Sequence, residues 1–273
     1  MGASRAGKWS PARDARGRSP VPVAYSRRVD FTGKSIPDTG FPDDDGTADP
    51  ALALALAAED VDDEEVSRAL RRARLLVPVV AILTEEEDVA PGELRREKSS
   101  DMAVPTILDP DGRRALPAFT SIEALARWRG DARPIPVEAA RAAHAAYAED
   151  ADTLLLDVAG PHPYEVTGGR LRALAEGRVH VAPHRDPDIV EVVRAAVAQE
   201  DAVAAAYLTD GGAELTLSLV AAAPPRQVTE AARRIVGRLA EDDVVRARLD
   251  RGLDLAMLAP GSEPGVPPLY VRA

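Results

Sequence analysis

The stretch that most constrains the fold is the run over residues 102–129, which predicts two strands joined by a tight turn and followed by a helix. Residues 102–108 are apolar and end at turn-forming residues. The sequence Asp-Pro-Asp-Gly at residues 109–112 predicts a reverse turn, because proline presets φ and glycine accepts a positive φ. Residues 113–118 then return as the second strand, so the run predicts a β-hairpin near the middle of the chain.

A helix should follow this hairpin directly. Thr120 and Glu123 have the spacing of a capping box, in which two side chains satisfy free backbone N–H groups at the helix start. The helical period then places Ile122, Leu125 and Ala126 on the buried side. The run carries no nucleophile, metal-ligand cluster or phosphate loop, so it predicts a scaffold and not a site.

Helical and extended patterns intermix along the remaining chain without a regular βαβ period or an internal repeat. We therefore predict an α+β protein: two small mixed α/β domains in tandem, with a disordered N-terminal extension. With 273 residues, the chain is long enough for each domain to bury its own core. We place the extension and lead-in at residues 1–48, the N-terminal domain at 49–177, the linker at 178–186 and the C-terminal domain at 187–273.

Proline, glycine and charged residues mark the ends of the other predicted elements. Aspartate followed by proline, at residues 49–50 and 186–187, combines an N-cap with a first-turn proline. The clustered acids Asp63, Glu64 and Glu65 open a helix that closes on arginines, so the helix dipole explains them without catalysis. Besides the hairpin and its helix, we expect helices over residues 51–59, 62–74, 138–148, 170–176, 187–199 and 225–240, a mobile loop over 84–100, and strands over 75–83, 133–137, 153–158, 164–166, 202–208, 214–221, 253–258 and 268–271.

Composition and charge exclude several classes of function. The chain has no cysteine, which excludes disulfides, thiolate metal sites and cysteine nucleophiles and suits a reducing cytosol. It has no run of about 18 apolar residues, so we expect no membrane span and a cytoplasmic protein. Residues 1–34 hold eight Lys or Arg and two Asp, whereas the whole chain has a net charge of −11. The folded body is therefore strongly acidic, and we expect it not to bind nucleic acid.

The first 34 residues are rich in Arg, Ser, Pro and Gly and show no apolar period, which is typical of disorder. Two interpretations stay open. The basic arm can contact RNA or anionic lipid. Alternatively, it is translated upstream sequence, and the native product lacks roughly the first 28 residues. The intact mass of the endogenous protein distinguishes the two.

Two local patterns approach known site motifs without matching them. The acidic stretch over residues 41–52 approaches a calcium loop, but Phe41 occupies the first ligand position and Leu52 that of the bidentate glutamate. Residues 32–35 resemble the end of a phosphate loop, but Arg28 stands where the earlier glycine is required. Neither a G-x-S-x-G elbow nor a G-x-G-x-x-G loop occurs. We therefore assign no catalytic residue and no cofactor.

Histidine spacing gives one weak metal-binding pattern. His180 and His184 lie four residues apart, with Asp186 and Asp188 nearby, but the proline before His184 argues against a helix that would align them. Weak surface capture of a metal ion is conceivable there, and we assign no metal site. The other single candidates are expected to be an exposed loop residue, a half-buried helix residue and a loop cap, namely His162, His144 and Asp157.

The sequence GRRALPAFTSIEAL at residues 112–125 resembles the hallmark of the SseB family, named for enhanced serine sensitivity. Residues 36–50 resemble the lead-in of actinobacterial members, residues 154–158 agree as well, and the region from residue 187 onward resembles the family's C-terminal domain. The resemblance thus covers most of residues 35–273. It implies a cytoplasmic bacterial protein with no established catalytic residue, cofactor or mechanism, so no functional residue is carried over.

These observations predict a non-enzymatic, two-domain cytosolic protein that acts through contacts with an unknown protein partner or in regulation. Phe119 and Trp128 mark the candidate interaction surface, because scarce aromatic residues often anchor interfaces. Core packing is the alternative role for both rings. The alternative function is a sensor of an amino acid or another small metabolite, or an unrecognised enzyme with a dispersed site, in a pocket between the domains.

Overall fold

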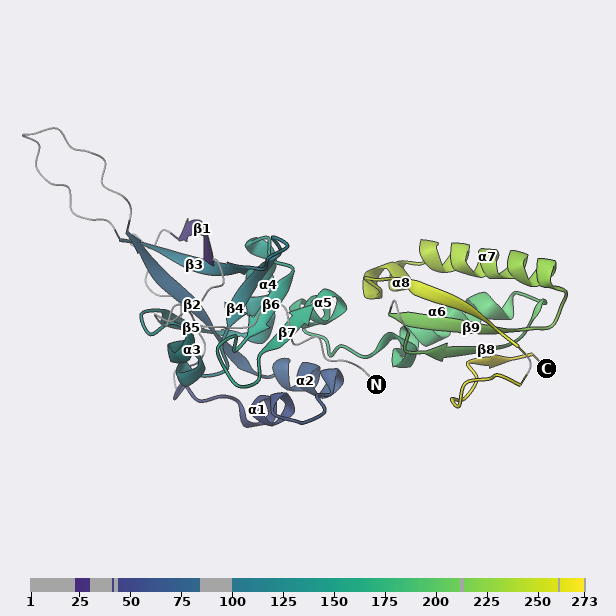
Figure 1. Ribbon diagram of the computed structural model, residues 1–273, viewed down its shortest axis with the longest axis horizontal. Coiled ribbons are helices and arrows are strands. Elements are labelled where there is room, and N and C mark those ends of the chain that lie inside the picture. Colours follow the sequence, from purple (N-terminus) through teal and green to yellow (C-terminus); the bar gives the residue numbers. More distant parts are fainter. Residues whose placement is uncertain are drawn as a thin grey trace, which may run out of the picture. The chain divides into compact units, whose positions relative to one another are not determined.

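The computed structural model describes residues 23–29, 41, 44–83, 100–211, 214–259 and 261–272, and the chain divides into two units (Figure 1). The first unit is Met1–His180 and the second is Val181–Ala273. The division falls within the predicted linker at residues 178–186. Each unit has its own mixed sheet and its own hydrophobic core, in agreement with the predicted α+β class.

The first unit is a sheet with helices on both faces. Its strand order is β5-β2-β3-β4-β6-β7, and β1 pairs antiparallel with β3. The strands are β1 Val23–Val29, β2 Arg74–Leu83, β3 Ser100–Leu108, β4 Arg114–Ala118, β5 Arg133–Glu138, β6 Thr153–Leu156 and β7 Tyr164–Thr167. The helices are α1 Pro50–Leu56, α2 Asp63–Leu70, α3 Ile122–Trp128, α4 Ala139–Ala148 and α5 Gly168–Ala175.

The predicted hairpin is present as β3 and β4, and one aspartate holds its turn. The Asp109 carboxylate accepts hydrogen bonds from the backbone N–H groups of Asp111 at 2.9 Å and Arg113 at 2.8 Å. It also accepts one from Nε of Arg113 at 2.8 Å. Gly112 has φ of +82°, a conformation that glycine adopts without steric cost. Local turn chemistry therefore determines the hairpin, as the sequence predicts.

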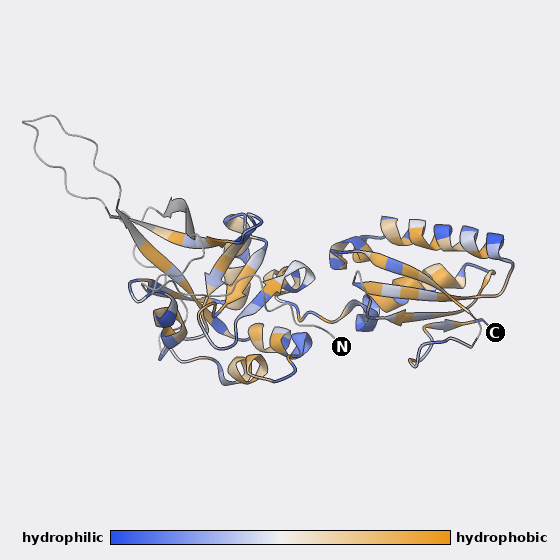
Figure 2. Cartoon of the chain, viewed as in Figure 1, coloured by the Kyte–Doolittle hydropathy of each residue, from blue (hydrophilic) through white to orange (hydrophobic). Residues whose placement is uncertain are grey.

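Alternate residues of the first sheet face two different cores, because successive side chains of a strand point to opposite faces. On β6, Leu154 and Leu156 pack with residues of α1, α2, α4 and α5. Leu155, between them, packs instead with Phe119 and residues of α3. Figure 2 shows the resulting concentration of apolar residues along the strands. The sheet is thus buried on both faces, and α3 covers the face opposite to the other helices.

Helix α3 begins one residue later than predicted, and its buried face also differs from the predicted one. Ser121, not Thr120, is the N-cap, and its hydroxyl accepts a hydrogen bond from the Ala124 backbone N–H at 3.1 Å. Ala124 is buried in the core with Phe119, whereas Ile122 is 49% exposed. The predicted burial of Ile122 and Ala126 is therefore wrong, since both are exposed, while that of Leu125 is confirmed.

Two segments of the predicted N-terminal extension and lead-in are among the described residues. Val23–Val29 forms β1 along β3, although the sequence shows no apolar period there. Asp44 forms an ion pair with the Arg74 side chain, which also donates hydrogen bonds to the carbonyl of Thr47 at 2.9 Å and that of Thr120 at 2.6 Å. The acidic lead-in is therefore fixed to the start of β2 by one arginine. Residues 32–35, whose resemblance to a phosphate loop was rejected, and most of the predicted loop at 84–100 lie outside the described residues.

The second unit has a four-stranded sheet of order β10-β9-β8-β11, in which β10 runs parallel to β9. Buried residues of α6 and α7 pack against one face of this sheet. The short helix α8 was not predicted, and its N-cap Asp242 accepts hydrogen bonds from two backbone N–H groups. The elements are the 3-10 turn η1 Pro183–Arg185, α6 Pro187–Ala198, β8 Val203–Thr209, β9 Leu215–Ala221, α7 Pro225–Glu241, α8 Asp243–Arg248, β10 Leu253–Leu258 and β11 Tyr270–Val271.

Candidate functional site

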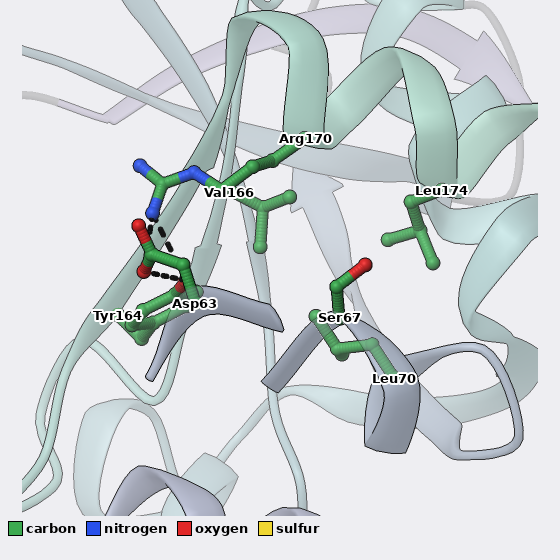
Figure 3. A pocket seen from close by; sticks show the side chains of 7 residues that line it. All are labelled: Asp63, Ser67, Leu70, Tyr164, Val166, Arg170 and Leu174. Atoms are coloured by element: carbon green, nitrogen blue, oxygen red, sulfur yellow. Dashed lines mark hydrogen bonds and ion pairs between the residues drawn. The ribbon is translucent and has the colours of Figure 1, made fainter. Parts of the chain in front are cut away.

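A small recess in the first unit brings together an acid, a phenol and a guanidinium from three elements (Figure 3). Asp63 lies in the first turn of α2, Tyr164 begins β7, and Arg170 lies on α5. Ser67 and apolar side chains complete the wall. The lining residues are Asp63, Ser67, Leu70, Tyr164, Val166, Arg170 and Leu174.

The three polar side chains bind one another. The Tyr164 hydroxyl donates a hydrogen bond to Oδ1 of Asp63 at 2.6 Å and accepts one from Nη1 of Arg170 at 3.0 Å. Nη1 of Arg170 also lies 2.6 Å from Oδ1 of Asp63. The guanidinium carbon is 5.5 Å from the centre of the Tyr164 ring, a cation–π distance. Each group is therefore satisfied within the cluster.

The electrostatics keep Tyr164 protonated. Burial raises the pKa of Tyr164 above its ordinary value, and the Asp63 carboxylate acts in the same direction, although Arg170 opposes them. Burial alone would lower the pKa of Arg170, but Tyr164 and Asp63 hold it above the ordinary value. A neutral phenol between an acid and a guanidinium is a hydrogen-bonding bridge and cannot serve as a general base near neutral pH.

The recess has room for little more than one water molecule. About 10 Å³ is accessible to the centre of a water-sized sphere, close to the minimum that a single water needs. The Ser67 hydroxyl accepts a hydrogen bond from the backbone N–H of His180 at 2.7 Å, which engages it in tying α2 to the end of the unit. The arrangement therefore joins α2, β7 and α5, and this cluster is mainly a structural clamp.

The candidate interaction residues Phe119 and Trp128 lie together, with their ring centres 5.4 Å apart and their planes tilted by 33°. Phe119 has no exposed surface and belongs to the core beneath α3. Trp128 packs against that core but is only partly buried. Phe119 can thus support Trp128 from below, while the part of Trp128 that faces solvent remains the candidate contact.

The outer side of α3 has further residues suited to contact. The guanidinium of Arg129 lies 5.9 Å from the centre of the Trp128 ring, and Ile122, at the start of the same helix, is 49% exposed. The Ile122 side chain lies against Gly46 of the lead-in, where an added Cβ would come within 2.3 Å of it. We call Ile122, Trp128 and Arg129 the α3 surface.

The weak metal pattern around His180 and His184 is not supported. Asp186 caps α6 by accepting a hydrogen bond from the backbone N–H of Asp188 at 3.0 Å, and both carboxylates form ion pairs with Arg248. These acids are thus engaged by an arginine distant in sequence. Across the described residues, no group of three or more His, Cys, Asp or Glu side chains could hold a metal ion.

The remaining single candidates have local roles. His162 is exposed, as predicted, but His144 is exposed as well, so its predicted half-buried position is wrong. The helical residues next to His144 are small alanines, and the face that they bury does not include position 144. Asp157 caps a loop, as predicted, by accepting hydrogen bonds from the backbone N–H of Thr120 at 2.9 Å and the Thr120 hydroxyl at 2.6 Å.

The Asp63–Tyr164–Arg170 cluster is absent from the sequence-based predictions. Tyr164 and Asp63 are 101 positions apart, and no local spacing relates them. The acids at the start of α2 are fully explained by the helix dipole, so nothing in the local sequence indicates that Asp63 forms an ion pair with Arg170. The one available signal was that a tyrosine begins β7 and an arginine follows the strand in α5, and this pattern is common in any α+β protein.

Comparison with known proteins identifies a domain in the first unit. Residues 50–173 match the family model described as the SseB protein N-terminal domain. Neither the curated proteins nor the solved structures include a match to the chain. None of the helices within the described residues is long and apolar enough to cross a membrane.

Proposed function

We propose that this protein acts through protein–protein contact and that the α3 surface is where a partner binds. One observation carries the proposal: Trp128 rests on the buried Phe119 ring while the helix keeps Ile122 49% exposed and Arg129 beside the indole. Tryptophan and arginine are enriched among the residues that dominate binding energy at interfaces. The function remains that of a non-enzymatic protein with an unidentified protein partner.

Several broader features belong to the same proposal. The second unit is the C-terminal domain of an SseB-like protein of actinobacterial type, supported by the resemblance of the sequence from residue 187 onward. The protein works in the cytoplasm, which the lack of cysteine supports. Its partner is a protein and not a nucleic acid, since the net charge of −11 repels phosphate.

Proximity labelling in the native cell, followed by pull-down with purified variants, tests the α3 surface. Ile122→Glu places a charge on the surface, whereas Leu54→Glu makes the same change at a 76% exposed position of α1 in the same unit. We expect Ile122→Glu to abolish capture of a labelled partner and Leu54→Glu to retain it. Thermal unfolding of both variants checks that each is folded. A partner that both variants capture equally would contradict the proposal.

The alternative function is a metabolite sensor. The recess at Arg170 contains the side chains that such a sensor would need. A guanidinium, a carboxylate and a hydroxyl are the groups that recognise an amino acid, but here they bind each other around a space for about one water. A thermal-shift series with serine and related amino acids distinguishes the two functions. We expect no shift, and a saturable rise in melting temperature that Arg170→Gln removes would favour the sensor.

A further inference from the structure

Strand β10 forms one end of the second sheet and leaves an edge that no other described strand covers. It pairs along its whole length with β9, from Leu253 opposite Leu215 to Leu258 opposite Val220. No described strand pairs with its other side. Natural edge strands are usually protected by lysine, proline or a bulge. The sequence LDLAML has only Asp254 as a charged residue, so this edge is open to pairing.

The side chains on one face of β10 are apolar and exposed. Leu255 and Met257 lie opposite Leu217 and Leu219 of β9, which have no exposed surface because the helices cover them. Leu255 and Met257 lie on the same face, since paired residues of adjacent strands point the same way. They are nevertheless 37% and 50% exposed. The helical layer therefore ends before β10.

Helix α7 adds an apolar residue at this end of the layer. Arg238 marks the side of α7 that faces α6, because its Nη1 donates hydrogen bonds to the Ala196 carbonyl of α6 at 3.3 Å and to Glu200 at 2.8 Å. Val236 lies two residues earlier, about 200° around the helix axis, and so on the opposite side. Helix α6 contacts β8 and β11, at the far end of the sheet from β10. Val236, which is 40% exposed, thus lies on the β10 side of the layer.

We propose that β10 pairs antiparallel with β10 of a second copy of this chain, about a two-fold axis that is perpendicular to the sheet and passes midway between the two Ala256 residues. In this register Leu255 lies opposite Met257 of the second copy, and the symmetry repeats the pair. The helical layers of both copies remain on the same face, and the two four-stranded sheets become continuous. Small Ala256 residues meet at the axis, and Asp254 lies opposite Leu258 of the other copy.

The self-complementary pattern of the strand favours a second copy over another occupant. Cross-strand apolar pairs stabilise a sheet, and like charges directly opposite one another destabilise it. An axis at Ala256 pairs the two most exposed apolar residues of β10 with each other and keeps the two Asp254 carboxylates apart. An axis at Asp254 would instead set those carboxylates side by side. This interface lies in the second unit, so its test does not depend on whether the α3 surface in the first unit binds a partner.

Sedimentation of the full chain over a concentration series tests the proposal. We expect a concentration-dependent dimer for the unaltered chain. Leu255→Lys and Met257→Glu should each raise the dissociation constant about tenfold or more, because symmetry removes two pairs at once. The double variant should restore dimerisation, since each lysine then lies opposite a glutamate of the other copy. Leu54→Lys, on α1, is the matched control and should leave the dimer intact.

Rescue by the double variant would show that residue 255 lies opposite residue 257 of the other copy. A general loss of apolar surface would not be reversed by adding a second charge. A chain that remains monomeric at all concentrations, or a dimer that both single variants leave unchanged, would overturn the proposal. So would a double variant that is no better than the singles. Hydrogen exchange of the unaltered protein gives a second measurement that needs no variant: β10 amides should gain protection as concentration rises. Equal exchange at low and high concentration would also overturn it.

Discussion

Asp157 binds Thr120 through two hydrogen bonds, one from the Thr120 backbone N–H at 2.9 Å and one from its hydroxyl at 2.6 Å. The two residues are 37 positions apart, and they join the end of β6 to the start of α3. The Asp157 backbone N–H donates in turn to the Ala118 carbonyl at 3.0 Å. Asp157 has φ of +46°, a left-handed conformation that aspartate and asparagine tolerate better than most residues. This link therefore sets where α3 begins.

Removing the Thr120 hydroxyl should destabilise the first unit. Thr120→Val keeps the size and branching of the side chain, but it leaves one oxygen of a largely buried carboxylate without its partner. We expect a loss of about 1–3 kcal/mol in the free energy of unfolding. Thr120→Ser, which keeps the hydroxyl, should cost less. Urea unfolding followed by circular dichroism measures both, and equal losses for the two variants would contradict a role for the hydrogen bond.

Asp157 should also give the protein a pH-dependent stability. Burial raises the pKa of Asp157 above its ordinary value of 3.8, although the hydrogen bonds from Thr120 oppose the shift. An acid whose pKa is raised by folding stabilises the folded state fully below its unfolded pKa, and that contribution is lost as pH rises through the folded pKa. Asp157→Asn keeps the left-handed backbone and removes the titration.

Comparing the unaltered protein with Asp157→Asn shows in which direction the Asp157 carboxyl makes stability depend on pH. The free energy of unfolding of the unaltered protein, minus that of Asp157→Asn, should fall as pH rises from below 3.8 and then level off. Denaturant unfolding at a series of pH values measures this difference. A difference that grows with pH over this range would show that the carboxylate is stabilised by folding, contrary to this account.

Tyr164 should titrate later than an ordinary tyrosine. Burial and Asp63 raise its pKa, so the tyrosinate absorbance of this residue should appear only above the ordinary value of 10. Tyr164→Phe removes that late component and leaves the ion pair between Asp63 and Arg170, at a cost of about 1–3 kcal/mol for the two lost hydrogen bonds. Spectrophotometric titration and urea unfolding measure the two effects. Tyr270→Phe is the control, and an unchanged late component in Tyr164→Phe would contradict the assignment.

The contrast between the hairpin and α3 shows which parts of the fold the sequence could predict. The turn at Asp109 depends on bonds within five residues, so its chemistry is visible in the local sequence. Thr120 and Glu123 also have a valid local capping pattern, yet Asp157 binds the Thr120 hydroxyl and Ser121 becomes the cap. A long-range hydrogen bond thus takes the place of the local one at Thr120. The buried face of α3 also differs from the local prediction, since Ala124 is buried and Ile122 is exposed.

The same reasoning explains which site residues could not be predicted. Arg170, Tyr164 and Asp63 come from three elements that meet only when the sheet forms. Likewise, the pairing of Arg248 with Asp186 spans 62 positions and replaces the metal pattern that the local sequence suggests. The sequence makes Trp128 a candidate only because tryptophan is scarce. Its division between core and surface, however, depends on how α3 packs against Phe119.

Truncating Trp128 separates its two roles. Trp128→Ala removes a partly buried ring that contacts Phe119, so we expect a loss of about 2–4 kcal/mol, at or below the usual range for a fully buried tryptophan. Trp128→Phe keeps an aromatic contact and should cost less than half as much. Thermal and urea unfolding measure the losses. If Trp128→Ala is as stable as the unaltered protein, the ring does not pack as described and its role lies wholly at the surface.

Glu200 should stabilise the second unit most above its ordinary pKa. The side chain is 2% exposed, and its two oxygens accept hydrogen bonds from Arg234 at 2.6 Å and Arg238 at 2.8 Å. These bonds, Arg234 first, hold the pKa of Glu200 below its ordinary value of 4.5 despite burial. An acid whose pKa is lowered by folding stabilises the folded state above the unfolded pKa, and that contribution is lost as pH falls through the folded pKa.

Glu200→Gln should therefore cost about 1–3 kcal/mol at neutral pH, and the difference from the unaltered protein should shrink as pH falls below 4.5. Glu191→Gln is the matched control, because Glu191 pairs with Arg194 on the exposed side of α6 and its side chain is 70% exposed. Such a surface pair contributes at most about 1 kcal/mol. Urea unfolding at several pH values measures both variants. An equal, pH-independent loss for the two would mean that the buried carboxylate does not join α7 to the end of α6.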